Sequence, residues 1–501
     1  MKSGSRLIPR RLRVSEARFS SRWGTLLVML GMAVGTGNIW RFPREAANNG
    51  GGSFLIAWVV FLLLWSVPLL MVEFAMGRAA RRGPIGAFAV MFGRGRAWMG
   101  AWVAFCATAI MFYYSVVMGW TLRYLWSSIS KGVPMTSPEA ATAFWEGFAG
   151  TPTAVVFHAV AMGLGVLVVA RGIGGIEKAV RWLIPALFVL VIALAIRAVT
   201  LPGAEAGLAF LFTPDPAALA EPRIWIAALT QNAWDTGAGW GLALAYAVYL
   251  RESEDTALNA FVLGFGNNTV SLLAGVMVLC TVFAVMPEAS DTIIGAGNEG
   301  LTFIWVPQLF GEMVGGSVLM VLFFLALFIA AWSSLIAMIE LATRVLIDAG
   351  LARGRAILVV GAAGFLLGLP SALSLPFFRN QDWVWGVGLI LSGFFFAYCV
   401  IRYGVDRFRT RFVNQAGSDI TIGRWWNWAM RFVLVEAVVL TVWWLWQAVQ
   451  ADDLGATLTP FSSFNVGTVL VQWGIALVIL LALNRFLAAR MSGDAWDAEE
   501  L

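Results

Sequence analysis

The sequence has few charged residues and few chemically reactive ones. Only 13% of its 501 residues are charged, whereas soluble domains average roughly 25%. It has one histidine, His158, and three cysteines, Cys106, Cys280 and Cys399, and all four lie within apolar runs. This scarcity argues against a disulfide framework or a metal cluster. It also leaves no evident nucleophile–base pair, so we expect neither an enzyme nor catalytic residues.

What the chain has in abundance is apolar sequence: 60% of its residues are hydrophobic and the mean hydropathy is +0.79. Apolar segments of about 20 residues, the length needed to cross a bilayer, recur about twelve times. We therefore expect an all-α polytopic membrane protein that contacts the lipid bilayer. The expected spans are 23–48, 52–77, 98–126, 153–170, 179–200, 224–250, 257–286, 314–347, 356–373, 383–403, 425–449 and 465–489.

Basic residues alternate between the connections. They are concentrated before the first span and after the second, fourth, eighth and tenth, whereas connections such as 127–152 and 287–313 are nearly free of them. By the positive-inside rule, both termini are expected to be cytoplasmic. The basic N-terminus lacks the apolar core of a cleavable signal peptide. These features predict a multi-pass protein of the plasma (inner) membrane.

Two spans contain residues that suit a membrane helix poorly. The stretches GMAVGTGNIWRFP (31–43) and QNAWDTGAGWG (231–241) combine glycines with Asn38, Arg41 and Asp235. Glycines alone would fit close helix packing, but polar and ionisable groups at membrane depth usually serve function. Interrupted segments at matching places in two halves predict an inverted repeat with a binding site between the halves.

The expected division of the chain follows from that repeat. It comprises a basic cytoplasmic tail (1–22), a first five-helix repeat (23–200), a second, inverted five-helix repeat (224–403), helices 11 and 12 (425–489) and a cytoplasmic tail (490–501).

Unwinding a helix inside the bilayer exposes carbonyl oxygens at one half-helix end and N–H groups at the start of the next. Free carbonyls suit an alkali cation, and N–H groups at a positive half-helix end suit a carboxylate. Hydroxyls of Ser333 and Ser334, Asn267 with Ser271, and the mid-span pair Tyr113 and Tyr114 supply further polar groups. The residues thus predict a cation-coupled carrier of a small solute that has a carboxylate.

Three motifs carry a family resemblance. GMAVGTGNIWRFP, NNGGGSFLI (48–56) and VEFAMGR (72–78) resemble the neurotransmitter:sodium symporter family, and the resemblance extends over all of the expected spans. It implies the leucine-transporter fold, with broken helices 1 and 6 in a five-plus-five inverted repeat. It further implies a symporter that uses one or two sodium ions to import an amino acid by alternating access.

The resemblance also implies site residues. Sodium site 2 would consist of Gly31, Val34, Ala330, Ser333 and Ser334. Sodium site 1 would consist of Ala33, Asn38, Asp235 and Asn267, together with the carboxylate of the substrate. The substrate would be bound by Ala33, Gly35, Thr36, Gly37, Ile110, Tyr114, Trp234, Asp235, Gly237, Trp240, Ser334 and Met338. Arg41, Asp382 and Trp234 would form the outer gate, and Tyr249 and Asp348 would belong to the inner gate. Glu73 matches a carboxylate that bonds to the unwound part of span six, and Glu340 is interpreted as structural support.

Several positions depart from the family pattern. Asp235 stands where relatives have Ser or Thr, and the positions equivalent to a chloride site are Trp58, Gln231, Asp235, Asn267 and Ser271. We infer that Asp235 replaces chloride, so chloride is not expected as a cofactor. The alternatives are that Asp235 carries a proton or contacts the substrate amine.

Two further departures affect sodium site 1 and the inner gate. Met32 occupies a usually polar place, which leaves the sodium stoichiometry open. The inner-gate arginine falls on Glu16 if Phe19 is the neighbouring aromatic residue, so Arg18 or Arg13 would have to replace it.

The identity of the substrate is only partly constrained. Gly35 stands where amine transporters carry an aspartate, which points to an α-amino acid, and the apolar lining favours a neutral, apolar side chain. A proton-coupled amino-acid transporter that uses Asp235, and a membrane sensor that binds an amino acid without moving it, are the alternatives. No nucleic-acid partner is expected, and the chain would be a monomer or a homodimer.

Overall fold

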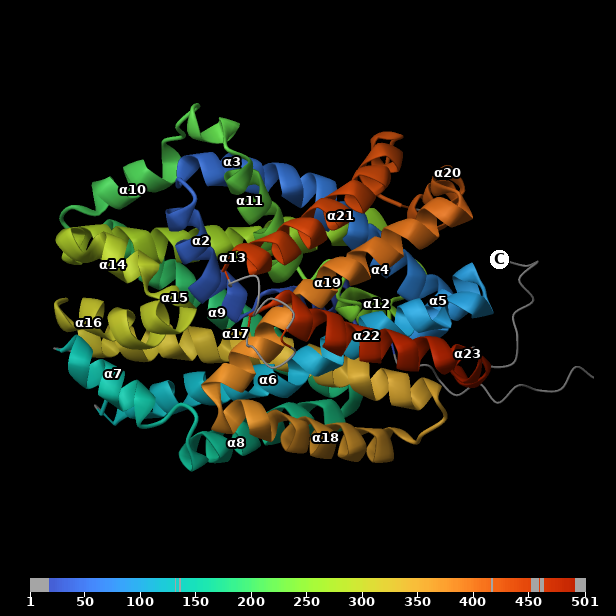
Figure 1. Ribbon diagram of the computed structural model, residues 1–501, viewed down its shortest axis with the longest axis horizontal. Helices are drawn as coiled ribbons and strands as arrows, with labels where there is room; N and C mark the ends of the chain where they lie inside the picture. The colour runs from blue at the N-terminus through green and yellow to red at the C-terminus, as the bar shows by residue number, and fades with distance from the viewer. Residues whose placement is uncertain are drawn as a thin grey trace, which may run out of the picture.

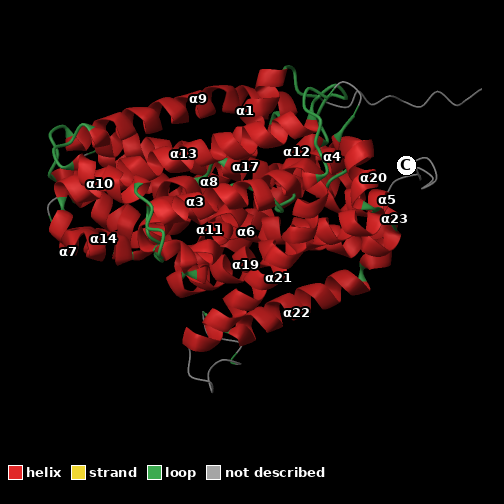
Figure 2. Ribbon diagram, turned by 90° about the horizontal axis from the view of Figure 1, so that it is seen from above, coloured by secondary structure: helices red, strands yellow, loops and turns green. Residues whose placement is uncertain are grey.

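The structure is a computed structural model that describes residues 18–130, 132–134, 137–415, 418–451, 459 and 464–491. Within these ranges every regular element is a helix, as expected for an all-α membrane protein. The long helices lie side by side along the longest axis of the molecule (Figure 1). Seen from above, the same helices form one bundle, with α22 along one flank (Figure 2).

The first half contains α1 (Arg22–Ala33), the π-helix η1 (Gly37–Arg41), α2 (Phe42–Asn48), α3 (Gly52–Phe61), the π-helix η2 (Leu62–Ser66), α4 (Val67–Ala80), α5 (Pro84–Phe92), η3 (Arg94–Arg96), α6 (Ala97–Ile129), α7 (Pro138–Glu146), α8 (Pro152–Ala170), α9 (Gly172–Val199) and α10 (Ala204–Phe212). The middle of the chain contains η4 (Ala218–Ala220), α11 (Pro222–Asp235), α12 (Leu242–Ala247), α13 (Thr256–Val285), η5 (Pro287–Ala289), α14 (Ser290–Gly295), α15 (Gly297–Glu299), η6 (Gly300–Trp305), α16 (Val306–Gly311) and α17 (Gly316–Asp348). The last part contains α18 (Arg353–Leu373), α19 (Leu375–Tyr403), α20 (Val405–Phe408), η7 (Arg409–Val413), α21 (Trp425–Ala451), α22 (Val466–Ala482) and α23 (Asn484–Met491).

The helices account for the expected membrane segments. In the described ranges, nine helical stretches are long and apolar enough to cross a membrane. Two further pairs of helices, each bent at a short break, are long and apolar enough when the two helices of a pair are counted as one span. The first pair joins α1 to the helix Gly37–Asn48 at an angle of 55°, and the second joins α22 to α23 at 59°. The sixth expected span is divided into α11 and α12 by residues 236–241. The interruptions therefore fall in the first and the sixth expected spans, as predicted.

The centre of the bundle is formed by α6 and α17, which pack against each other. In the most apolar 18-residue stretch of each helix, 78% of the residues are buried in α6 and 72% in α17, compared with 33% in α9 and 28% in α21. Apolar side chains that are exposed on α9 and α21 therefore face outward, where a bilayer would cover them.

The two ends of the bundle differ in charge. Helices α7, α10, α14 and α16 lie at one end, and α5, α20 and α23 lie at the other (Figure 1). Arg94 and Arg96 in η3, next to α5 and α23, and Arg407 and Arg409 near α20 place the arginine-rich connections at the second end. This end is called the arginine-rich end below.

Candidate functional site

The first helix is interrupted beside a glycine whose backbone lies too close to other groups for a side chain. At Val34, the C-cap of α1, ψ becomes extended at 107°, and η1 begins three residues later. A Cβ atom on Gly35 would lie 2.8 Å from Ser334 Oγ and 2.9 Å from the Tyr114 hydroxyl. Glycine is therefore required at this position, and a side chain of the amine-transporter type does not fit.

The second break contains three glycines in the left-handed region. Gly237, Gly239 and Gly241 have φ values of 70°, 87° and 78°, which other residues rarely adopt. The freed backbone is held by Glu73 of α4, which accepts hydrogen bonds from the N–H groups of Gly239 (2.7 Å) and Leu244 (3.0 Å). This buried carboxylate thus stabilises the interruption, as the family pattern implied.

A cavity of about 370 Å³ lies between the two breaks. Its lining includes every predicted substrate residue: Ala33, Gly35, Thr36, Gly37, Ile110, Tyr114, Trp234, Asp235, Gly237, Trp240, Ser334 and Met338. The N–H of Thr36 donates a hydrogen bond to the Tyr114 hydroxyl at 3.2 Å. From the first break the cavity extends to α15, which lies in the connection between α13 and α17, away from the arginine-rich end.

Four of the five residues predicted for sodium site 2, Val34, Ala330, Ser333 and Ser334, lie together at the edge of the first break. Ser333 Oγ donates to the Ala330 carbonyl at 3.1 Å and lies 3.5 Å from the Val34 carbonyl. Ser334 Oγ lies 3.3 Å from the same Val34 carbonyl. Gly31 faces α9, where a Cβ would come within 3.1 Å of Ile184. The cluster offers hydroxyl and carbonyl oxygens, the ligand type that a hard cation prefers.

Three of the four residues predicted for sodium site 1, Asn38, Asp235 and Asn267, belong to a buried hydrogen-bond network, and Ala33 lines the cavity. Asn38 Nδ2 donates to Asn267 Oδ1 (2.9 Å) and to Ser271 Oγ (2.7 Å). Ser271 Oγ and Gln231 Nε2 both donate to Asp235 Oδ2, at 2.9 and 3.2 Å. Asp235 is 3% exposed, and its Oδ1 has no hydrogen-bond partner among the described residues. An unpaired buried carboxylate oxygen is costly, so this atom fits a cation or a proton.

One predicted chloride-site equivalent lies outside that network. Trp58 is buried against Phe42, with ring centroids 4.6 Å apart, and its indole N–H has no hydrogen-bond partner among the described residues. Its backbone carbonyl accepts a hydrogen bond from Asn232 at 2.8 Å. The structure therefore brings together four of the five residues and leaves the Trp58 side chain beside them.

The predicted outer-gate residues Arg41, Asp382 and Trp234 all line the cavity. Arg41 Nε lies 3.5 Å from Glu45 Oε1, and its guanidinium lies 5.0 Å from the centre of the Trp234 ring. No ion pair between Arg41 and Asp382 is present in the described part of the chain. Sequence reasoning missed Glu45, although its position four residues after Arg41 on one helical face was a signal.

At the opposite end, Asp348 is held by groups that the sequence analysis did not assign. Arg344 Nη2 lies 2.8 Å from Asp348 Oδ1, the Gly83 N–H donates to Oδ2 at 2.6 Å, and Arg82 lies 4.0 Å away. Arg344 also lies 5.7 Å from the centre of the Tyr249 ring. The spacing of Arg344 and Asp348, one helical turn, could have predicted this pair.

Tyr249 belongs to an adjacent set of contacts. Its hydroxyl donates to Glu340 Oε1 at 2.7 Å, and Arg353 Nη2 lies 2.5 Å from Glu340 Oε2. Glu340 is fully buried and thus connects α17 to α18 and to the segment that follows α12. These contacts agree with a supporting role for this carboxylate.

The first described residues of the chain pack beside Tyr249 at the same end of the bundle. Phe19 is 2% exposed and lies edge-on to Tyr246 and Tyr249. Arg18 pairs with Glu252 at 3.4 Å, where both side chains are exposed, and does not reach Asp348. Arg13 and Glu16 lie outside the described residues. Phe19 thus packs against Tyr249, and among the described residues Arg344, not Arg18, is the arginine paired with Asp348.

Comparisons with known proteins can be added to this geometry. A family model described as the sodium:neurotransmitter symporter family matches residues 16–146 and 149–491. An uncharacterized sodium-dependent transporter of Methanocaldococcus jannaschii is 31% identical over 448 residues, which cover 84% of this chain and 88% of the archaeal protein. The sodium-dependent serotonin transporter of Drosophila melanogaster is 28% identical over 80% of this chain and 72% of its own length.

One solved structure is similar over nearly its whole length. The crystal structure of MhsT in complex with L-phenylalanine superimposes with a TM-score of 0.75 at 30% identity. The match covers 85% of this chain and 99% of MhsT.

Proposed function

Since the chain belongs to the sodium:neurotransmitter symporter family, we propose that it is a sodium-coupled symporter that imports a neutral amino acid by alternating access. The observation that carries this proposal is the meeting of two broken helices on one cavity, beside two clusters of oxygen ligands. The family and the fold are those of membrane transporters. Import requires in addition that the cavity open alternately to each side.

The substrate is an α-amino acid whose carboxylate binds at the first break. The N–H groups around Gly35 and Gly37 start a half-helix whose positive end favours an anion, and the Tyr114 hydroxyl lies beside them. The absence of room for a side chain at Gly35 supports a ligand that brings its own carboxylate. The apolar lining by Ile110, Trp240 and Met338 supports a neutral, apolar side chain.

Sodium is a co-substrate in this proposal. The hydroxyls of Ser333 and Ser334 and the Val34 carbonyl would bind one ion, and Asn38, Asn267 and Asp235 would bind a second ion next to the amino-acid carboxylate. An anion and a cation that share one low-dielectric pocket stabilise each other. This mutual stabilisation couples the uptake of the solute to the sodium gradient.

The fixed charge of Asp235 makes chloride unnecessary. Gln231 and Ser271, at the positions of chloride ligands, both donate hydrogen bonds to Asp235 Oδ2. Donors that would hold a chloride ion are thereby occupied by a carboxylate of the chain itself. We expect uptake to be equal in chloride and in gluconate.

The conformational cycle would begin from the arrangement described above. Binding of sodium and solute would draw Arg41 from Glu45 toward Asp382 and would let Trp234 cover the substrate. Separation of Phe19 from Tyr246 and Tyr249 would then open the other end. The arginine-rich end would be the cytoplasmic one, in a plasma (inner) membrane, as the charge distribution favours.

The first experiment is a thermal-shift panel of the twenty amino acids, each with and without sodium. A ligand of the folded state raises the midpoint of unfolding, so a bound amino acid will raise it more in sodium than in choline. Uptake into proteoliposomes with an inward sodium gradient then tests transport. Equal uptake rates in sodium and choline at fixed pH would reject sodium coupling.

One observation favours a second candidate function. The unpaired Oδ1 of buried Asp235 could bind a proton in place of sodium, so proton-coupled uptake of the same solute is the alternative. It predicts uptake that follows a pH gradient in choline. A chain that binds an amino acid in the thermal-shift panel but shows no counterflow would instead be a sensor.

A further inference from the structure

Helices α1 and α9 pack against each other along a seam, where glycines of α1 lie next to larger side chains of α9. Gly24, Val28 and Gly31 lie on one face of α1, because residues three and four apart share a helical face. A Cβ atom on Gly24 would lie 1.8 Å from Glu177 Oε1, and one on Gly31 would lie 3.1 Å from Ile184 Cδ1. The seam therefore extends from Glu177 at one end to Ile184 at the other.

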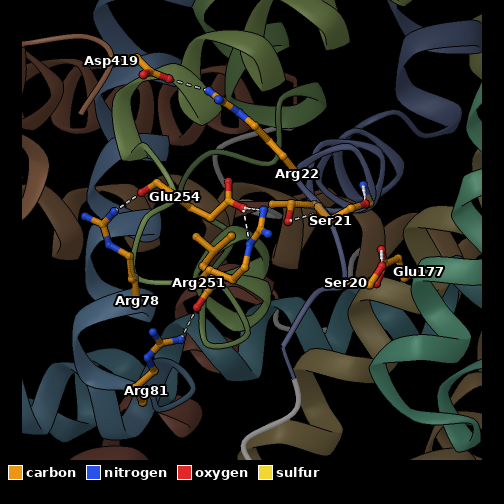
Figure 3. A network of polar contacts seen from close by, with 12 residues as sticks. Ser20, Ser21, Arg22, Arg78, Arg81, Glu177, Arg251, Glu254 and Asp419 are labelled. Carbon is orange, nitrogen blue, oxygen red and sulfur yellow. Dashed lines mark hydrogen bonds and ion pairs between the residues drawn. The ribbon is translucent and has the colours of Figure 1, made fainter. Parts of the chain in front are cut away.

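At the arginine-rich end of the seam, Glu177 accepts two hydrogen bonds from Ser20, just before α1, and this pair of bonds is called the clasp. The Ser20 N–H donates to Glu177 Oε2 at 2.9 Å, and the Ser20 hydroxyl donates to Oε1 at 2.5 Å. Arg181, one turn further along α9, lies 3.3 Å from the same Oε1. Glu177 is 4% exposed although it lies near the end of the bundle. Figure 3 shows Ser20 and Glu177 joined beside the start of α1.

Ser20 directly follows Phe19, whose buried ring is called the aromatic plug of the inner gate. Phe19, immediately before Ser20, donates its N–H to the Tyr249 carbonyl at 3.2 Å and packs edge-on against the rings of Tyr246 and Tyr249. Ser21, immediately after, caps α1 by accepting a hydrogen bond from the Gly24 N–H at 3.0 Å. The position of Glu177 thus fixes both the plug and the first turn of the helix.

We propose that Glu177 is a positioning residue of the cytoplasmic gate: its clasp on Ser20 keeps α1 seated on α9, and release of the clasp opens the inner pathway. The proposal rests on the proposed function, because it assumes that the inner end opens during transport. The far end of the seam is Gly31, a member of proposed sodium site 2. Separation of α1 from α9 would therefore expose that site to the cytoplasm as the plug leaves.

The glycine at position 24 gives a specific way to break the clasp. In Gly24→Ala the new methyl group would occupy the place of the Glu177 carboxylate oxygen, which is the flexible end of a side chain and can move aside. Glu177→Gln removes the charge and leaves one acceptor oxygen for the two Ser20 donors, without changing the size of the side chain. Hydrogen bonds to a charged acceptor are stronger than neutral ones, so either substitution will favour the open seam.

Opening of the seam can be measured without transport. Val28 lies between Gly24 and Gly31 on the seam face and is 1% exposed, and the native Cys106, Cys280 and Cys399 are fully buried. A Val28→Cys reporter in inside-out vesicles is treated with a membrane-impermeant maleimide in sodium-free buffer. We expect Glu177→Gln and Gly24→Ala each to raise the labelling rate about tenfold or more, because 1.4 kcal/mol corresponds to tenfold.

Three matched variants separate this effect from general damage. Ser20→Thr keeps both donors of the clasp. Gly174→Ala adds a methyl group with no atom within 4 Å, and Asp419→Asn removes the charge from an exposed pair with Arg22 at the same end. All three are expected to label at the parental rate. An equal rise in Gly174→Ala or Asp419→Asn would overturn the proposal, because the labelling would then report loosening of the whole end.

The outcome for the clasp is independent of the outcome for transport. Faster labelling in both clasp variants supports the clasp even if the parent shows no sodium-dependent uptake, a result that would sink only the proposed function. Parental labelling rates in Glu177→Gln and Gly24→Ala, in a chain that does transport, would overturn the clasp and leave the proposed function intact.

Discussion

Gly35→Ala is the smallest change that should damage the proposed binding site. The added Cβ would lie 2.8 Å from Ser334 Oγ and 2.9 Å from the Tyr114 hydroxyl, both closer than a carbon and an oxygen normally approach. Neither neighbour can move without cost, because Ser334 borders the Val34 carbonyl and Tyr114 is hydrogen-bonded to Thr36. One methyl group therefore displaces a proposed sodium ligand and a proposed carboxylate ligand together.

The magnitude follows from this overpacking. Insertion of a methyl group into a filled site costs about 1–3 kcal/mol. If the bound state bears this cost, the dissociation constants of sodium and of the amino acid rise between about fivefold and 150-fold. We expect both to rise, since the two displaced groups belong to different sites. The thermal midpoint in the absence of ligands should fall as well, because the close contacts with Ser334 and Tyr114 are present in the free site.

The measurement is a sodium titration of amino-acid binding to the purified protein, with the thermal midpoint recorded in parallel. Gly163→Ala in α8, where no atom lies within 4 Å of the new Cβ, is the matched control and should bind as the parent does. If Gly35→Ala bound both ligands with parental affinity, the site would not lie at the first break and the reasoning would be refuted.

Three further substitutions test separate parts of the site. Asp235→Ser should make uptake chloride-dependent, with a loss of about tenfold or more in gluconate, since the chloride ligands would lose their fixed anion; equal uptake in the two buffers would contradict this, and loss of pH dependence instead would favour the proton role. Ser333→Ala should weaken sodium binding about tenfold, equivalent to one lost ligand of about 1.4 kcal/mol, and should leave amino-acid binding at saturating sodium unchanged; parental sodium affinity would exclude Ser333 as a ligand. Glu73→Gln should lower the free energy of unfolding by about 1–3 kcal/mol, because an amide group cannot satisfy both N–H donors of the second break; an unchanged thermal midpoint would show that these bonds do not stabilise the fold.

The helices and their interruptions were predictable because their signals are local. A run of about 20 apolar residues identifies a span, and glycines beside Asn38 or Asp235 mark where the span must open. The ends of the helices were harder to place. We expected a span from residue 383, but α19 begins at Leu375, where Ser374 caps it. The added turns carry Arg379 and Asp382, which face the cavity and not lipid, so hydropathy alone could not include them.

The partners of individual charges were predicted less well, for two different reasons. Arg41 with Glu45 and Arg344 with Asp348 are one helical turn apart, so their pairing was readable from spacing. The contact of Ser20 with Glu177 joins residues 157 positions apart, and no local pattern predicts it. The orientation of Trp58 likewise depends on its packing against Phe42. Contacts of this kind are set by the tertiary fold.

These contacts suggest why the first helix is broken and not merely bent. The half before the break is held at the arginine-rich end by Glu177 and along α9 by Ile184. The half after the break carries Arg41, which lies over Trp234 at the other end. A continuous helix would transmit any movement of one half to the other. With Gly35 between them, each half can follow its own gate, and the ligands bound at the break would be the groups that both gates respond to.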